Sequence, residues 1–251
     1  MTTNETRSVI RLSPMEVPKA SDVLANELRE RILSGEYPEG TPLPPERELV
    51  LQTKMSRTTV REALRILEVQ DLINVKVGRA GGAFVQQPGK ESVANSLELL
   101  IRGRQLRLSS IHETREAIEP TCARLAAQHR TSADLRQLEA ANKALADSGS
   151  LEEFLQANVD WHIAVAMAGQ NEILTGLMMA LSRAIYTATN NESFVDDAVR
   201  AVALRAHRSV TRAISERDSD AAARRMNRHV HAYAAAAQQA DSRTEISVPE
   251  E

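Results

Sequence analysis

The sequence predicts a mainly α-helical protein with two parts, an N-terminal winged helix-turn-helix module and a C-terminal all-helical bundle. The first observation is the distribution of helix breakers, because residues 1–88 hold seven of the nine prolines and five of the ten glycines. The second is alanine, a strong helix former, which occurs 31 times in residues 89–251. The third is the order of local patterns in the first part, which runs helix, helix–turn–helix and β-hairpin.

The N-terminal module is predicted to span residues 18–88, after a disordered tail at 1–17. Apolar residues near a 3.6-residue period predict a first helix over 21–33, which ends at Ser34-Gly35. Two shorter helices follow at 46–53 and 57–70, and Ser56 is suited to cap the second. An alternating strand at 72–77, a glycine-rich turn at 78–82 and a return strand at 83–85 complete a small β-hairpin wing.

The C-terminal domain is predicted to span residues 89–240 and to contain six or seven helices, followed by a disordered tail at 241–251. Polar and glycine-containing breaks separate the helical patterns. We expect helices near 90–106, 110–130, 132–146, 151–169, 171–189, 193–216 and 219–239.

Composition limits the class of protein. The chain has 251 residues and a formal net charge of −3, and its single cysteine excludes an internal disulfide framework. The sequence contains no apolar run of about 20 residues and no secretion signal. We therefore expect a cytoplasmic protein with no membrane partner.

The helix at 57–70 carries a pattern suited to DNA. Arg57 and Arg61 are four residues apart and so share a helix face, and Thr58 and Thr59 add short hydroxyls. Residues 54–79 contain six basic and three acidic side chains, a local excess of three positive charges in a chain of negative net charge. The alternative is an ordinary amphipathic surface helix with scattered arginines.

Three of the six histidines have spacings that suit a metal site. Asn158 and His162 lie one helical turn apart, whereas His207 and His229 lie on the two arms of a predicted helical hairpin. Three imidazoles and one oxygen ligand suit a divalent ion such as Zn²⁺ or Ni²⁺. The alternative is that these are structural histidines. His112 and His129 are expected at the solvated surface, and Arg115 is spaced to pair with Glu119.

The N-terminal module resembles the GntR family of bacterial transcription regulators. The matching residues are Gly35, Pro38, Gly40, Leu43, Pro44, Glu46, Arg47 and Leu49, then Ser56 to Leu64, and the wing glycines Gly78 and Gly81. The resemblance implies that Arg47, Arg57 and Arg61 contact DNA, that Thr58 and Thr59 hold phosphates, and that the wing around Gly78 enters the minor groove. Ser56 belongs to the same predicted surface. In two places, Lys54 and Asp71, the sequence departs from the usual glycine of the family.

The C-terminal part is similar to the FCD ligand-binding domain of the FadR subfamily, through Arg115 to Pro120, Asn158 to His162, and the segments containing His207 and His229. The resemblance implies a divalent metal ion held by Asn158, His162, His207 and His229, with Arg115 meeting the carboxylate of a small effector. It also implies a homodimeric, metabolite-responsive regulator, in most cases a repressor, that binds a palindromic double-stranded DNA operator and is not an enzyme. Two alternatives are a metal-dependent hydrolase and a constitutive DNA-binding dimer without an effector.

Overall fold

A computed structural model of the chain describes residues 17–248 apart from 79–80, 90–91, 95–96, 98–99, 102, 104, 192–193 and 241–242. The chain divides into two compact units between Pro88 and Gly89, which is also where the proline and glycine pattern places the boundary. The predicted tail at 1–17 lies almost wholly outside the described residues. No helix in the described part of the chain is long and apolar enough to cross a membrane.

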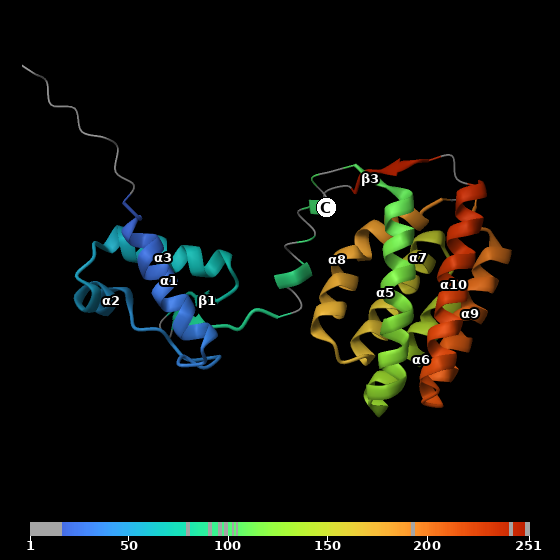
Figure 1. Ribbon diagram of the computed structural model, residues 1–251, viewed down its shortest axis with the longest axis horizontal. Helices are drawn as coiled ribbons and strands as arrows, with labels where there is room; N and C mark the ends of the chain where they lie inside the picture. The colour runs from blue at the N-terminus through green and yellow to red at the C-terminus, as the bar shows by residue number, and fades with distance from the viewer. Residues whose placement is uncertain are drawn as a thin grey trace, which may run out of the picture. The chain divides into compact units, whose positions relative to one another are not determined.

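The N-terminal unit is a winged helix-turn-helix. Its helices are α1 (Ala20–Leu33), α2 (Glu46–Thr53) and α3 (Arg57–Val69), and its wing is formed by β1 (Ile73–Lys76) and β2 (Gly82–Val85) (Figure 1). The two strands pair antiparallel, with Ile73 opposite Val85. Apolar side chains from all three helices and both strands form one core. The predicted fold of this unit is confirmed.

The connections in this unit depend on residues in the left-handed region. Lys54 ends α2 with φ 56° and Asp71 follows α3 with φ 55°. These are the two positions where the family usually has glycine, and a side chain in this conformation costs roughly 1–2 kcal/mol. In the wing, a Cβ at Gly81 would lie 2.4 Å from the backbone oxygen of Lys76, so the tight turn requires glycine there.

The C-terminal unit is a helical bundle closed at one end by a two-stranded sheet. The helices are α5 (Leu108–His129), α6 (Ser132–Asp147), α7 (Leu151–Ala168), α8 (Glu172–Thr189), α9 (Asp197–Ser215) and α10 (Ser219–Ala240). Helices α5 and α10 run side by side, and α7 lies behind them (Figure 1). The buried core includes side chains from each of the helices named here and the fully buried Trp161.

The sheet at the end of the bundle corrects two sequence predictions. Strand β3 (Leu106–Arg107) pairs antiparallel with β4 (Glu245–Ile246), so the predicted helix over 90–106 does not reach Leu106. The rest of that helix lies partly outside the described residues. The prediction of disorder at 241–251 is wrong for 243–248, because Ile246 is 4% exposed and Val248 is 6% exposed. The apolar core, and not local sequence pattern, orders this segment.

A third correction concerns the start of α9. The predicted helix over 193–216 begins only at Asp197, because Asp196 caps it by accepting a hydrogen bond from the backbone N–H of Val199 at 2.8 Å.

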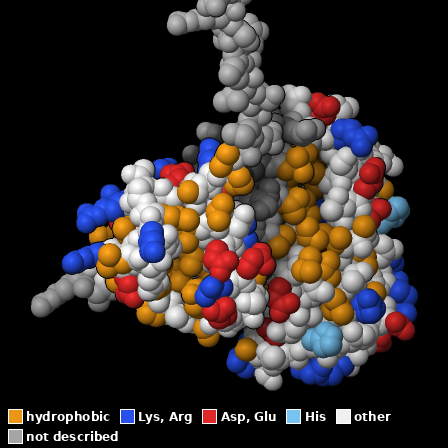
Figure 2. All heavy atoms as spheres, turned by 60° about the vertical axis from the view of Figure 1, so that its left-hand side comes forward, with side chains coloured by type: hydrophobic (Ala, Val, Ile, Leu, Met, Phe, Trp, Pro, Cys, Tyr) orange, Lys and Arg blue, Asp and Glu red, His pale blue; other side chains and the backbone are white. Residues whose placement is uncertain are grey.

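One face of the molecule is shown in Figure 2, where basic and acidic side chains are interspersed with hydrophobic ones.

Candidate functional sites: a DNA-binding surface and a buried histidine site

Helix α3 presents its polar side chains on the exposed side of the N-terminal unit. Ser56 caps the helix by accepting a hydrogen bond from the backbone N–H of Thr59 at 3.1 Å, as its sequence predicts. Arg57, Thr58 and Arg61 are exposed, whereas Val60 and Ala63 are fully buried. The helix is therefore fixed by its apolar side and leaves two arginines and a threonine free of the core.

Arg61 is held by an acidic residue of the preceding helix. Its Nε donates to Oε2 of Glu46 at 2.8 Å, although Arg61 is exposed and Glu46 only half-buried. A groove of about 730 Å³ lies between this pair, the proline-rich segment at 42–45 and the wing strand β2. Arg47 is exposed on α2, and Gly78 begins the wing turn with φ 126°. Arg79, part of the predicted basic cluster, lies outside the described residues.

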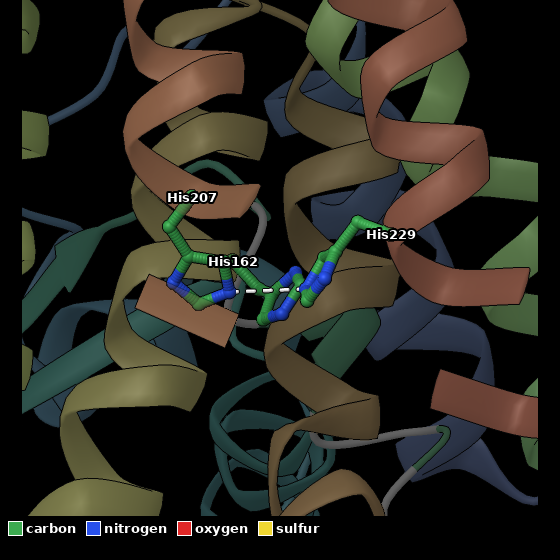
Figure 3. A group of neighbouring side chains, drawn as sticks. All are labelled: His162, His207 and His229. Carbon is green, nitrogen blue, oxygen red and sulfur yellow. Dashed lines mark hydrogen bonds between the residues drawn. The ribbon is translucent and has the colours of Figure 1, made fainter. Parts of the chain in front are cut away.

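Three histidines meet inside the helical bundle. His162 comes from α7, His207 from α9 and His229 from α10, and their rings point toward one another (Figure 3). One ring nitrogen of each lies within 4.8 Å of those of the other two, and the Nε2 atoms of His207 and His229 are 3.0 Å apart. A tetrahedral ion with bonds of 2.0–2.1 Å has ligand atoms about 3.3 Å apart, so the arrangement suits such an ion.

The histidines are buried and therefore favour the neutral form that binds metals. His207 is fully buried, His162 is 2% exposed, and His229 is half-buried. Burial lowers the pKa of His162, although Glu119 opposes this effect. Burial and the two neighbouring histidines lower the pKa of His207 well below its ordinary value. Burial, followed by His162 and Arg115, lowers the pKa of His229 to about 3.

Helix α5 brings an ion pair to the histidines. Arg115 donates through Nε to Oε1 of Glu119 at 2.6 Å, and its Nη2 lies 3.1 Å from Nε2 of His162. The other carboxylate oxygen of Glu119 lies 2.5 Å from Nδ1 of His162. Burial alone would raise the pKa of Glu119, but Arg115 and His162 together hold this pKa well below its ordinary value. The carboxyl group is therefore ionised.

A narrow cavity joins most of the predicted site residues. Arg115, Asn158, Thr189 and His229 line it, together with apolar side chains of α7 and α9 and the ring of Tyr233. Only about 10 Å³ of it is open to the centre of a water-sized sphere, which is room for about one water molecule. Asn158 thus lines the same cavity as His229, whereas Asp160 is exposed and accepts a hydrogen bond from Gln156.

Sequence reasoning missed two polar residues near this cavity. Glu119 was placed only in a helix-surface pair with Arg115, yet it is 1% exposed and links Arg115 to His162. His112 was expected at the surface but is 4% exposed and faces the ring of Tyr233, with ring centroids 6.2 Å apart. The apolar neighbours of Glu119, Ile118 and Cys122, were the only local signal that this side of α5 turns inward.

The chain matches two family models, one for each unit. Residues 20–85 match "Bacterial regulatory proteins, gntR family", and residues 110–232 match "FCD domain". The galactonate operon transcriptional repressor of Escherichia coli K12 is 34% identical over 210 residues, covering 80% of this chain and 90% of the relative. This chain belongs to the GntR family. It therefore belongs to a family of transcription regulators and not of enzymes, which argues against the hydrolase alternative.

Two further comparisons agree with the assignment of this GntR regulator. The HTH-type transcriptional repressor NanR of Citrobacter rodentium is 28% identical over 237 residues, covering 90% of this chain and 88% of the relative. Among solved structures, the GntR protein of Streptococcus agalactiae has a TM-score of 0.63 and 24% identity, covering 86% of this chain and 99% of that protein. This structural likeness supports the fold.

Proposed function

We propose that this GntR regulator is a cytoplasmic, homodimeric repressor that binds a palindromic operator and releases it when a small carboxylate binds in the helical domain. The proposal depends above all on the convergence of three histidines and Arg115 at one buried site. A domain that served only for dimerisation has no need of such a cluster. The name of the Escherichia coli relative mentions galactonate, a sugar carboxylate, which is of the proposed effector class.

The proposed cofactor is a divalent metal ion, Zn²⁺ or Ni²⁺, held by His162, His207 and His229 with the side-chain oxygen of Asn158. The ion would orient a carboxylate and supply positive charge. The charges of Arg115 and Glu119 cancel, and the imidazoles are neutral, so a bound ion leaves about two uncompensated positive charges in a buried site. A carboxylate effector neutralises part of this charge, and the fork of Arg115 suits a carboxylate.

The cavity has to open to hold such an effector. A surface groove of about 430 Å³ between α9 and α10 shares four lining residues with the cavity, namely Val199, Ala203, His229 and Tyr233. These side chains separate the cavity from the groove. Their displacement therefore joins the cavity and the groove into one pocket of the size that small ligands occupy. An effector that binds this open arrangement better than the closed one shifts the protein toward it. Movement of α9 and α10 is then the first step of the response.

At the DNA, we assign Arg57 and Arg61 to base edges and phosphates, and Arg47, Ser56, Thr58 and Thr59 to the backbone. The exposure of Arg57 and Thr58 on α3 supports this assignment, as does the groove beside Arg61. The wing around Gly78 enters the minor groove. A two-fold dimer would place two copies of α3 on half-sites one helical turn, about 10 bp, apart or a multiple of that spacing.

A screen of sugar acids against the metal-loaded full chain tests the proposal. A cognate acid raises the melting temperature and releases operator DNA in a mobility-shift assay, whereas the matching neutral sugar, which lacks the carboxylate, does neither. A His207→Ala variant loses bound metal in elemental analysis and no longer responds to the acid. The effector proposal fails if a broad panel of carboxylic acids changes neither the melting temperature nor DNA binding.

A further inference from the structure

Glu119 is a carboxylate with two polar neighbours, and it is 1% exposed. Its Oε1 accepts the Nε–H of Arg115, and its Oε2 faces Nδ1 of His162. Neither this Oε2 nor this Nδ1 forms a hydrogen bond of standard geometry in the described part of the chain, so the 2.5 Å contact between the two atoms is the interaction open to both. Because a buried charge is costly unless it is paired, the position of Glu119 requires both neighbours.

The contacts on the two sides of His162 require the same tautomer. A neutral imidazole carries its proton on one nitrogen and a lone pair on the other. The carboxylate of Glu119, paired with Arg115 at 2.6 Å, only accepts hydrogen bonds, so the nitrogen that faces it at 2.5 Å, Nδ1, carries the proton. The guanidinium of Arg115 only donates, so Nε2, 3.1 Å from it, carries the lone pair.

We infer that Glu119 is the positioning residue of the histidine site: it fixes the proton of His162 on Nδ1, so that Nε2 keeps its lone pair, and it orients Arg115 in the same cavity. The inference rests on the proposed metal site and goes beyond it. Because Nε2 carries the lone pair, we assign it to the metal ion; in the metal-free chain it lies 3.1 Å from Nη2 of Arg115, which has to move aside when an ion binds.

His207 is oriented in another way, which makes Glu119 specific to His162. Nδ1 of His207 has no hydrogen-bonding partner in the described part of the chain, and the ring is held by stacking on Trp161. Loss of Glu119 therefore changes the proton position at one ligand and leaves the ring of His207 in place. A carboxylate behind a metal-binding histidine commonly changes metal affinity by about 10- to 100-fold.

The direct test is nitrogen NMR of the metal-free full chain with ¹⁵N-labelled histidine, because two-bond couplings distinguish the two tautomers. In the native chain we expect the proton of His162 on Nδ1. In Glu119→Gln the charged acceptor of the Nδ1 proton is lost and Arg115 loses its anionic partner, so a larger population with the proton on Nε2 is expected. Competition with a chromogenic chelator is then expected to show zinc affinity reduced by about 10- to 100-fold.

The matched control is Glu116→Gln, three residues earlier on α5. Glu116 also faces a histidine nitrogen, Nδ1 of His231 at 2.9 Å, but this contact is exposed and outside the site. The Glu116→Gln variant is expected to leave the His162 tautomer and the zinc affinity unchanged. Glu119→Asp keeps the charge but is one methylene too short to reach both partners, so it restores only part of the affinity.

Two results would overturn the role of Glu119. One is a proton on Nε2 of His162 in the native chain, a result that needs no variant and so stands even if Glu119→Gln does not fold. The other is a folded Glu119→Gln variant with native zinc affinity. Failure of the native chain to bind zinc would overturn the proposed metal site. The tautomer measurement is made without metal, so it tests the role of Glu119 separately from the metal site.

Discussion

The ring of His207 lies parallel to the indole of Trp161, with ring centroids 3.7 Å apart and planes inclined by only 8°. The indole is itself fixed, because its Nε1 donates to Oγ1 of Thr211 at 3.1 Å and the same oxygen accepts from Asn142 at 2.8 Å. Helices α6, α7 and α9 thus cooperate to orient one histidine. The sequence left open whether Trp161 borders the site or fills the core, and it does both.

This contact predicts an optical signal for metal binding. Trp161 is the only tryptophan in the chain, so intrinsic fluorescence reports on this site alone. Addition of Zn²⁺ is expected to change the emission intensity in a saturable way, because the ion changes the charge on the stacked imidazole. His207→Ala is expected to abolish the change, whereas His231→Ala, at an exposed position, retains it. Saturable quenching of equal size in both variants would contradict the prediction.

The buried histidines predict acid sensitivity of the metal-free protein. The pKa of His229 is lowered to about 3 in the folded state, so this ring stays neutral while the unfolded chain takes up a proton below about pH 6.5. The unfolded state then binds more protons, so the free energy of unfolding falls as pH decreases from about 6.5 toward 3. The slope is about 1.4 kcal/mol per pH unit for each histidine that remains neutral.

Urea unfolding at pH 6.5 and 5.5 in the presence of a chelator measures this slope. Above pH 5 the carboxylates remain ionised in both states, so the histidines dominate the interval. His229→Gln is expected to reduce the slope by up to about 1.4 kcal/mol per pH unit, because one titrating group is removed. His129→Gln, at an exposed position, provides the control. A native profile that is flat over this interval would show that these rings are protonated in the fold.

The contacts of the C-terminal segment from residue 243 onward predict that its deletion destabilises the helical domain, an effect that the local sequence pattern does not indicate. Arg243 donates to the backbone oxygens of Thr187 and Ala188, and Ile246 and Val248 are almost fully buried. Full burial of one such side chain contributes about 1.5–3 kcal/mol. Deletion of residues 243–251 is therefore expected to reduce the free energy of unfolding of the helical domain by about 3 kcal/mol or more, as measured by urea denaturation. Deletion of 249–251 alone leaves β4 in place and serves as the control.

The sequence predicts those features of this fold that depend on neighbours along the chain. The helices α1, α2, α3 and α6 to α8 begin and end within one or two residues of their predicted positions, because hydrophobic period, capping residues and breakers act locally. Strand β4 is different, since two residues carry no period and the partner strand precedes α5. Its order comes from a contact between distant segments.

The same distinction separates the histidines from Glu119. The resemblance to the FCD domain predicts that His162, His207 and His229 lie together, and the structure places them within one cluster. The Arg115–Glu119 spacing predicted only a helix-surface ion pair worth a few tenths of a kcal/mol. Burial changes its role, because the carboxylate meets a histidine on another helix. Such a role depends on the packing of α5 against α7, which spacing alone does not give.

Because the N-terminal end of α3 is exposed, we expect a substitution there to weaken DNA binding. Arg57→Ala is expected to weaken binding to an operator selected from random duplexes by about 1–3 kcal/mol, since it removes a contact to a base or to its flanking phosphate. Arg29→Ala is a suitable control, because Arg29 lies half-buried on α1 and its guanidinium is hydrogen-bonded to Gln70. A mobility-shift titration measures both. Undiminished operator affinity in Arg57→Ala would contradict the assignment of α3.

The pair between Glu46 and Arg61 predicts an effect on DNA specificity separate from charge. Glu46→Gln removes a negative charge beside the groove, so affinity for a scrambled duplex is expected to rise several-fold. The variant also releases Arg61 from a defined position, so the ratio of operator to scrambled affinity is expected to fall.

Glu48→Gln isolates the second effect. Glu48 lines the same groove and its loss changes the charge equally, but its side chain accepts a hydrogen bond from Gln52 and does not hold Arg61. Fluorescence anisotropy with both duplexes at two salt concentrations gives the two ratios. If Glu46 positions Arg61 for base readout, only Glu46→Gln reduces the ratio, because the electrostatic gain is the same in both variants. If the ratio of operator to scrambled affinity is the same in Glu46→Gln and Glu48→Gln, Glu46 acts only through its charge.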